Sequence, residues 1–274
     1  MNAQDQKTTE LLQARISDAI AKSDRGECGV LPFLTPREKK QAERMLAYGG
    51  YLPQAYFFGG YAEAERSCLF LLPEYLLECL SAPLHACDKD ELALLLGDTL
   101  TNAVCALRVD GSGYRTLSHR DYLGSILGLG LERDALGDIA LQDEHSAVVF
   151  CSRTVAQFLS DELTKVAADT VKCRLWTVDE SFTDGRRYQK MSDTVASARL
   201  DCAVASLTNL SRDAAQELIR KGFVEVDYEC EERVGEILQP PVILTIRGHG
   251  KFRLLPFGGE TKKGRLRLQA EKYI

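Results

Sequence analysis

The sequence predicts an α+β protein in three parts: a small N-terminal α/β domain over residues 1–82, a central β-α-β-β-α-β domain over 83–183, and a C-terminal domain with a helix pair and a small β-sheet over 184–274. Its 274 residues are too many for one core, because single domains average about 150 residues. Apolar residues make up 45% and charged residues 27% of the chain, which excludes disordered and collagen-like proteins. The spacing of apolar residues also changes from part to part.

The N-terminal part combines two helices with a small sheet. Apolar residues recur at helical spacing over 11–20. A second helix begins at Thr35-Pro36-Arg37-Glu38, where a threonine caps, a proline takes the first helical position and an acid completes a capping box. Apolar runs at 55–58 and 68–72, joined by a Gly59-Gly60 turn and a polar loop, indicate two strands.

The central part alternates strands and helices after a helical stretch near 91–100. Strands are expected at 104–109, 139–142, 147–151 and 171–178, with helices that begin near Ser118 and Thr154. This order predicts a ferredoxin-like sandwich, which RNA-recognition-motif (RRM) domains share, so the domain is expected to be RRM-like. The third strand of RRM domains carries aromatic residues that stack bases. Here it reads Ser146-Ala147-Val148-Val149-Phe150-Cys151, which favours packing over base stacking and leaves both open.

The C-terminal part follows a polar linker over 180–192. Apolar residues recur at helical spacing over 200–207 and again over 215–219, so two short helices can bury against each other. Ser211 is placed to cap the second helix, and Gly222 is placed to end it in a left-handed conformation. Strands are expected at 224–226, 242–247 and 251–254.

The spacing of cysteines and histidines favours neither disulfides nor a metal site. The nine cysteines are odd in number and scattered through apolar segments, and the four histidines lie far apart. We therefore expect a reducing compartment, the cytoplasm, and neither a metal nor a cofactor. The longest uncharged stretch, 45–62, contains four glycines and a proline, so no membrane association is expected. Acids and amides occupy the first ten residues, where a secretory signal needs basic and then apolar residues.

Charge is unevenly distributed along the chain. Residues 1–185 carry 18 basic and 28 acidic side chains, whereas 186–274 carry 16 basic and 12 acidic ones. From Arg247 to the end there are eight basic residues and two acids. A basic end on an acidic body predicts local contact with phosphates, and a solvated tail is the alternative.

The C-terminal part resembles the S4 RNA-binding domain. The helix-turn-helix-strand signature of that domain is matched in order by Arg199-Leu200-Asp201, Ser211-Arg212, Ala215, Leu218-Ile219, Gly222, Val224 and Val226. The segments 246–252 and 259–265 resemble the end of the YlmH family of bacterial proteins, in which this module is C-terminal. Phe58-Gly59-Gly60-Tyr61, Ala64-Glu65-Arg66, His119-Arg120-Asp121-Tyr122 and Gly137-Asp138-Ile139 resemble that family too. Together these matches span nearly the whole chain.

The resemblance implies an RNA-binding protein that associates with the large ribosomal subunit, where similar proteins act in ribosome-associated quality control. We expect rRNA and/or tRNA as partners, no DNA, and a monomer. Arginine forks suit phosphate oxygens, and a surface of this kind suits the backbone of folded RNA. The candidate RNA contacts are Arg199, Arg212, Arg220 and Lys221 on the helix pair, Lys251, Arg253, Lys262, Lys263, Arg265 and Arg267 on the sheet and tail, and His119 and Arg120 in the central part.

Two acidic features qualify this surface. Asp201 is expected to orient Arg199 or Arg212, or to cap its helix locally, and not to bind a ligand. The family usually has Val-Asn where this chain has Val226-Asp227, and further acids follow at Glu229, Glu231 and Glu232. Negative charge there would repel a phosphate path across that hairpin, so the helix pair is expected to make the main contacts.

Three functions remain in competition. The leading hypothesis is a non-catalytic RNA-binding factor. The second is an RNA-modifying enzyme of the pseudouridine synthase or methyltransferase type, although in those proteins the S4 module usually precedes the catalytic domain. The third is a protein-interaction scaffold that uses the acidic N-terminal half, with secondary RNA binding.

No catalytic residue is predicted. His119-Arg120-Asp121 mimics the catalytic loop of protein kinases, but Ile126 stands where that loop needs its metal-binding asparagine. A helix start explains the segment better, since Ser118 is placed to cap and Asp121 to reach back to the cap amide. His119 and Arg120 then remain available for RNA.

Overall fold

The computed structural model describes residues 3–179, 181–262 and 264–274. The chain forms two compact units, unit 1 ending at Gly185 and unit 2 beginning at Arg186. This division lies two residues from the expected start of the C-terminal part at 184. The finer division of unit 1 at residue 82 stays a prediction. Among the described residues, no helix is long and apolar enough to cross a membrane.

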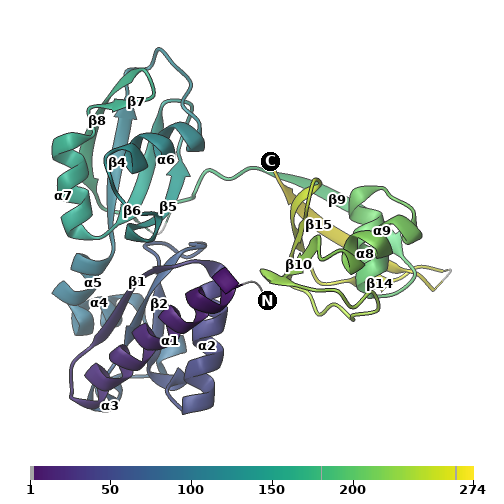
Figure 1. The fold of residues 1–274 in the computed structure, drawn as a ribbon, viewed down its shortest axis with the longest axis horizontal. Helices are drawn as coiled ribbons and strands as arrows, with labels where there is room; N and C mark the ends of the chain where they lie inside the picture. The colour runs from purple at the N-terminus through teal and green to yellow at the C-terminus, as the bar shows by residue number, and fades with distance from the viewer. Residues whose placement is uncertain (1–2, 180, 263) are drawn as a thin grey trace. The chain divides into compact units, whose positions relative to one another are not determined.

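The N-terminal part of unit 1 contains a three-stranded antiparallel sheet (Figure 1). Its strands, in the order β1-β3-β2, are β1 (Gly29–Leu34), β2 (Ala55–Phe58) and β3 (Ser67–Leu71). Helices α1 (Ala3–Asp24) and α2 (Pro36–Gly49) pack on one face through a shared apolar cluster. The predicted capping box at Thr35 and Glu38 is confirmed, and so are the strands β2 and β3.

Strand β1 was not predicted from the sequence. It lies at the edge of its sheet, where strands tolerate a proline such as Pro32, and its register shifts between Leu31 and Leu34. An edge strand with a proline and an irregular register lacks the alternating signal that marks ordinary strands.

Short helices lead from this sheet to the next one. They are the 3₁₀ turns η1 (Leu52–Gln54) and η2 (Leu84–Ala86) and the helices α3 (Glu74–Leu77), α4 (Lys89–Leu96) and α5 (Asp98–Ala103). Buried leucines of α4 and α5 lie in the same apolar cluster as β1 and β3, on the sheet face opposite to α1 and α2.

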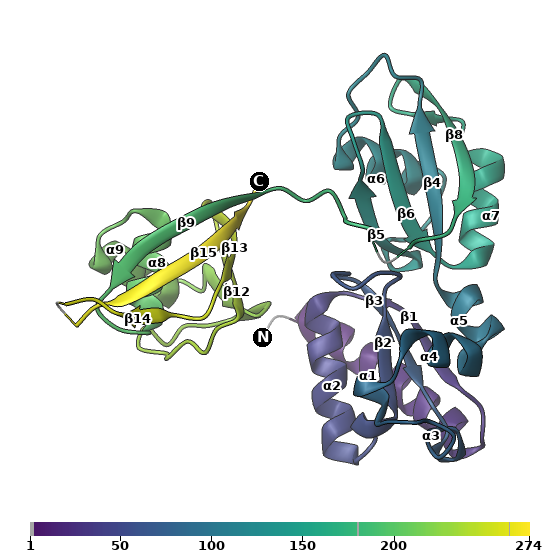
Figure 2. The ribbon, with the colours of Figure 1, turned by 180° about the vertical axis from the view of Figure 1, so that it is seen from behind.

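The second sheet of unit 1 has five strands in the order β5-β6-β4-β8-β7. They are β4 (Cys105–Gly111), β5 (Leu136–Leu141), β6 (Ser146–Cys151), β7 (Lys165–Val166) and β8 (Asp169–Trp176). Helices α6 (His119–Gly128) and α7 (Arg153–Glu162) cover one face, and η3 (Arg133–Ala135) precedes β5 (Figure 2). The chain order β4-α6-β5-β6-α7-β8 agrees with the expected β-α-β-β-α-β order, with the short β7 added.

Strand β6 is buried on both faces. Val149 packs with α6 and α7, whereas Val148 and Phe150 pack with Phe33 and Phe70 of the three-stranded sheet. A strand that is covered on both sides reads as a continuous apolar run, which is why its sequence shows no polar alternation. The two sheets of unit 1 therefore share one core.

Asp138 and Arg66 join the two sheets of unit 1 by hydrogen bonds. Tyr61 Oη donates to Asp138 Oδ2 at 2.7 Å, and the amides of Glu65 and Arg66 donate to the same carboxylate. The buried Arg66 guanidinium donates to the carbonyls of Leu136 and Phe33. These segments carried part of the family resemblance, and the structure gives them a role in holding unit 1 together.

Unit 2 is a helix pair packed on a seven-stranded sheet. The helices are α8 (Leu200–Thr208) and α9 (Arg212–Arg220). The strands are β9 (Tyr188–Val195), β10 (Val224–Val226), β11 (Glu229–Cys230), β12 (Val242–Ile246), β13 (Gly250–Leu254), β14 (Gly258–Glu260) and β15 (Leu266–Tyr273). Ser211 caps α9 and Gly222 follows it at φ +68°, so both predicted helix ends are confirmed.

The expected polar linker over 180–192 is wrong for its second half. Residues 188–195 form β9, which pairs antiparallel with β15 from Tyr188 opposite Tyr273 to Val195 opposite Leu266. Met191 and Val195 turn toward the core, and polar side chains separate them. The hydrogen-bonding partner lies about seventy residues further along the chain, so local sequence gives no sign of this strand.

Candidate nucleic-acid interface

Asp201, in the first turn of α8, is the centre of the candidate interface. Its side chain is fully buried and accepts hydrogen bonds from three residues. Arg199 donates through Nε at 3.0 Å and Nη2 at 3.3 Å, Arg212 through Nε at 2.8 Å and Gln216 through Nε2 at 2.9 Å. The Arg199 and Arg212 side chains remain 36% and 54% exposed, so each guanidinium still presents N–H donors to the surface. We call these four residues the Asp201 clamp.

The carboxyl group of Asp201 is ionised at neutral pH. Burial raises the pKa of Asp201, but hydrogen bonds from Arg199, Arg212 and Gln216 outweigh it and hold that pKa well below the usual range. The hydrogen bond to Asp201 also raises the pKa of Arg212. Two fixed cations around one anion leave net positive charge at this surface.

The loop between β11 and β12 holds Arg199 in place. Its residues supply backbone acceptors to the start of α8: Leu200 N donates to the Glu236 carbonyl at 2.8 Å, and Asp201 N to the Val234 carbonyl at 3.3 Å. Gly235 lies against the Arg199 guanidinium so closely that a Cβ there would come within 3.1 Å of Nη1. The loop thereby accepts hydrogen bonds from the backbone amides at the start of α8, and Gly235 packs against the side chain of Arg199.

Helix α9 extends this cationic surface. Arg212, Gln216 and Arg220 follow one another at intervals of four residues and so lie along one side of the helix. Arg220 Nη2 donates to Gln216 Oε1 at 3.2 Å, which links Arg220 to the Asp201 clamp. Lys221, by contrast, pairs with Glu217 at 2.6 Å. Of the four cations predicted on the helix pair, Arg199, Arg212 and Arg220 are linked by hydrogen bonds through Asp201 and Gln216. The fourth, Lys221, forms an ion pair with Glu217 instead.

A pocket of about 330 Å³ brings Arg265 to the same region. Its lining includes Arg212, Arg265, Asn209 at the α8–α9 turn and Asp193 on β9. Arg265 Nε donates to Thr194 Oγ1 at 3.1 Å, and its Nη2 donates to the Thr194 carbonyl. Asp193 accepts from Ser206 Oγ at 2.6 Å, which lowers its pKa. Arg212 thus contributes both to the Asp201 clamp and to a hollow that it shares with Arg265.

Lys251 and Arg253 lie on the other face of the sheet. They alternate along β13 with Phe252 and Leu254, which are buried in the core beneath the helices. Lys251 Nζ lies 4.9 Å and 4.8 Å from the ring centroids of Tyr228 and Tyr273. The structure therefore places these two predicted contacts on the sheet face opposite to the helix-pair cations. Because side chains alternate along a strand, Lys251 and Arg253 face away from the helices when Phe252 and Leu254 face them.

The remaining predicted contacts are dispersed. Arg267 on β15 and Lys262 are exposed, and Lys263 lies outside the described residues. His119 and Arg120 are exposed at the start of α6 in unit 1, whereas the other candidates belong to unit 2. The expected capping box of α6 is confirmed by the bonds from Asp121 N to Ser118 Oγ and from Ser118 N to Asp121 Oδ2.

Sequence reasoning missed Gln216, the third donor to Asp201. Its position four residues after Arg212 was a usable signal, since both must lie on one side of the predicted helix. The contribution of Thr194 on β9 could not be anticipated without the pairing of β9 with β15.

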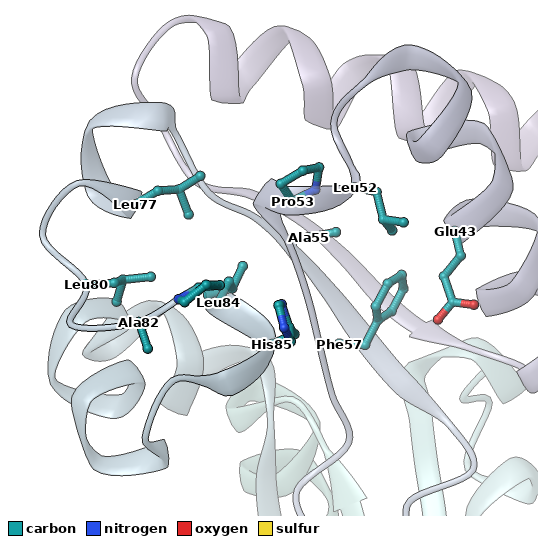
Figure 3. A pocket seen from close by; sticks show the side chains of 11 residues that line it. Glu43, Leu52, Pro53, Ala55, Phe57, Leu77, Leu80, Ala82, Leu84 and His85 are labelled. Carbon is teal, nitrogen blue, oxygen red and sulfur yellow. The ribbon is translucent and has the colours of Figure 1, made fainter.

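Unit 1 contains a second hollow of different character. A pocket of about 600 Å³ is lined mainly by apolar side chains, among them Leu52, Phe57 and Leu84 (Figure 3). Glu43 and His85 also line it, and none of the described lining residues is a lysine or arginine. This lining offers no cationic contact to a phosphate.

The cysteines are free thiols, and the described residues contain no group of three or more His, Cys, Asp or Glu side chains that could hold a metal ion. Burial raises the pKa of Cys28 and of Cys173 to about 11, which keeps these thiols protonated at neutral pH.

Comparison with known proteins yields three similarities. Residues 108–180 match the family described as "Putative RNA-binding domain in YlmH". The chain is 28% identical over 253 residues to the ribosome-associated protein quality control protein P2 of Bacillus subtilis (strain 168), with 88% of this chain and 85% of that protein covered. The solved structure of the cell division protein ylmH from Streptococcus pneumoniae is 17% identical, with a TM-score of 0.47 over 64% of this chain and 93% of that one.

Proposed function

Because the resemblance to YlmH is confirmed by the family match and the Bacillus relative, we propose that this protein is a non-catalytic RNA-binding factor that works on ribosomes. Its partners are rRNA and/or tRNA on the large subunit, its role is quality control of stalled translation, and it acts as a cytoplasmic monomer. The role and the ribosomal partner are carried over from the name of the relative. The observation that carries RNA binding in unit 2 is the Asp201 clamp.

The Asp201 clamp suits a phosphate backbone. A guanidinium held by a carboxylate has fewer orientations to lose when it binds, and its free N–H groups match the oxygens of a phosphate. Arg199, Arg212 and Arg220 are joined through Asp201 and Gln216, and Arg265 lines the 330 Å³ pocket together with Arg212. We assign the primary contacts to these four arginines.

The finer domain assignments belong to the same proposal. The helix pair, its capped and glycine-ended second helix, and the sheet beneath it support an S4-type domain for unit 2. The strand order β5-β6-β4-β8, with two helices on one face, supports an RRM-like domain for 83–183. Lys262, Arg267 and the β13 cations are assigned peripheral roles. His119 and Arg120 are assigned a separate contact from unit 1.

Cosedimentation with purified large ribosomal subunits tests this function. We expect binding at 50 mM salt that weakens on the order of a hundredfold by 200 mM if about five phosphates are contacted. The variant Arg199→Gln with Arg212→Gln should lose most of this binding, because amides can still donate to Asp201 but carry no charge. The control Lys22→Gln with Arg25→Gln removes the same charge from exposed positions at the end of α1.

Absence of the wild-type protein from large subunits at low salt would overturn the proposal. If large subunits retained both double variants equally well, the Asp201 clamp would not be the RNA contact in unit 2. Mass analysis of RNA from a deletion strain tests the non-catalytic assignment separately, because a missing modification would reveal an enzyme.

A further inference from the structure

The face of the five-stranded sheet that turns away from α6 and α7 carries a cationic group of side chains around the single tryptophan of the chain. Val109, Val171 and Cys173 pack toward the helices, so the residues that alternate with them project from the other face. Those residues are Arg108 and Asp110 on β4 and Lys172, Arg174 and Trp176 on β8. We call these five residues the Trp176 surface.

The neighbouring part of the same face is closed. Phe150 on β6, the third strand of the β-α-β-β-α-β order, is fully buried. Its ring centroid lies 4.9 Å from that of Tyr61 and 5.7 Å from that of Phe182. Gln142 on the β5 side donates to the Thr183 carbonyl, so the segment after β8 crosses the sheet there. The position where RNA-recognition sheets stack a base on the third strand is unavailable in this protein.

The Trp176 surface remains accessible. Trp176 is 38% exposed, Arg174 is 60% exposed and Lys172 is also exposed. The guanidinium carbons of Arg108 and Arg174 lie 5.1 Å and 5.2 Å from the centre of the Trp176 ring. Both guanidinium groups therefore lie over the Trp176 ring, and Lys172 lies further along the same face of β8.

Asp110 fixes these cations without neutralising the group. Its carboxylate accepts from Arg108 Nε at 2.7 Å and forms an ion pair with Arg174 at 3.4 Å. Asp143 also acts on Arg108, to which Ser146 links it, so two carboxylates face three cations and the surface keeps a net positive charge in a unit that is acidic as a whole. A purely structural tryptophan would gain most from complete burial, yet Trp176 as a residue remains 38% exposed.

We propose that the Trp176 surface binds a single-stranded segment of RNA by stacking a base on Trp176 and holding the adjoining phosphates with Arg174 and Lys172. Aromatic rings and arginine planes are the groups on which unpaired bases stack, and flanking cations supply the backbone contacts. This inference rests on the proposed RNA-binding function and assigns its residues within the matched 108–180 segment. It is a site separate from the Asp201 clamp of unit 2.

The single tryptophan makes the test direct. The full-length protein is titrated with an eight-nucleotide oligoadenylate, and Trp176 emission is followed together with the anisotropy of the fluorescein-labelled oligonucleotide. We expect saturable quenching with the same midpoint as the anisotropy change. Trp176→Ala should weaken binding about fivefold or more, whereas Trp176→Phe should keep most of it. Arg174→Gln, at an exposed position, provides a second variant that leaves the ring in place.

Phe158→Ala is the matched control, because Phe158 on α7 is an aromatic residue of nearly equal exposure, 37%, on the helix-covered side of the sheet. Binding by Trp176→Ala within twofold of wild type, equal weakening by Phe158→Ala, or quenching by polyglutamate in place of RNA would each overturn the inference. Large-subunit cosedimentation of the same proteins separates the two proposals. Wild-type cosedimentation with no octamer binding refutes only the Trp176 surface, and octamer binding at Trp176 without cosedimentation refutes only the ribosomal role.

Discussion

Nε of Arg212, the first residue of α9, lies 2.8 Å from Oδ2 of Asp201 in the first turn of α8. The hydrogen bond spans the turn between the helices and fixes the angle at which both present their arginines. Since Arg199 donates to both carboxylate oxygens, Asp201 connects the candidate interface with the packing of unit 2.

Asp201→Ala should destabilise unit 2. The substitution leaves Gln216 and two guanidiniums without their acceptor, and because the arginines are partly exposed, they can turn to water. We expect a loss of about 1–3 kcal/mol in the free energy of unfolding, measured by urea denaturation followed by circular dichroism. Asp213→Ala, at an exposed position in the same helix pair, should change that free energy by less than about 0.5 kcal/mol.

The contribution of Asp201 should depend on pH in one direction. Its pKa is lowered on folding, so its stabilisation is complete above the unfolded-state pKa of about 3.9 and declines as the pH falls below that value. The difference in melting temperature between wild type and Asp201→Asn should therefore be large at pH 7 and shrink toward pH 2.5. A constant difference across this range would contradict the assignment.

The salt dependence of RNA binding should report the two arginines of the Asp201 clamp. Loss of two phosphate contacts lowers the slope of log K against log salt by about 1.4–1.8. Arg199→Gln with Arg212→Gln should show this reduced slope between 50 and 200 mM salt, measured by filter retention of labelled rRNA. The slope of the Lys22→Gln, Arg25→Gln control should equal that of wild type.

Gly60→Ala should destabilise unit 1 more than a change of conformation alone explains. Gly60 has φ +102°, and a Cβ there would lie 2.2 Å from the buried ring of Phe150. We expect a loss of about 2–5 kcal/mol, made up of left-handed strain and overpacking. Gly113→Ala, at φ +86° with nothing within 4 Å, should lose only about 1–2 kcal/mol. Thermal unfolding followed by Trp176 fluorescence, which reports unit 1 alone, distinguishes them.

Local signals predicted most of the regular structure. The caps at Thr35, Ser118 and Ser211 and the glycine at 222 determined where helices begin and end. Strand β9 escaped prediction because its partner is distant in sequence. Strand β1 escaped because a proline interrupts its pattern at an edge.

In the candidate site, too, contacts between residues close in sequence could be predicted, whereas those set by tertiary packing could not. The sequence indicated that Asp201 orients Arg199 or Arg212, or caps its helix, and the structure shows that it accepts hydrogen bonds from both arginines. The four-residue intervals between Arg212, Gln216 and Arg220 were a further local signal that was not used. The position of Lys251 and Arg253 beyond the sheet follows from alternation with Phe252 and Leu254, but only the packing of the helices reveals which face is the outer one. The sequence did not single out Trp176, because it does not show which part of the sheet face is covered. In the structure Phe182 packs against Phe150, and Trp176 on the same face stays partly exposed.

The pairing of β9 with β15 brings the two ends of unit 2 together. Its first and last strands are adjacent in the sheet, and the amide of Ile274 donates to the carbonyl of Arg187. The polypeptide enters and leaves this module at a single point. Because its two ends lie side by side, unit 2 has the geometry that tolerates insertion as a block into a surface loop of another protein.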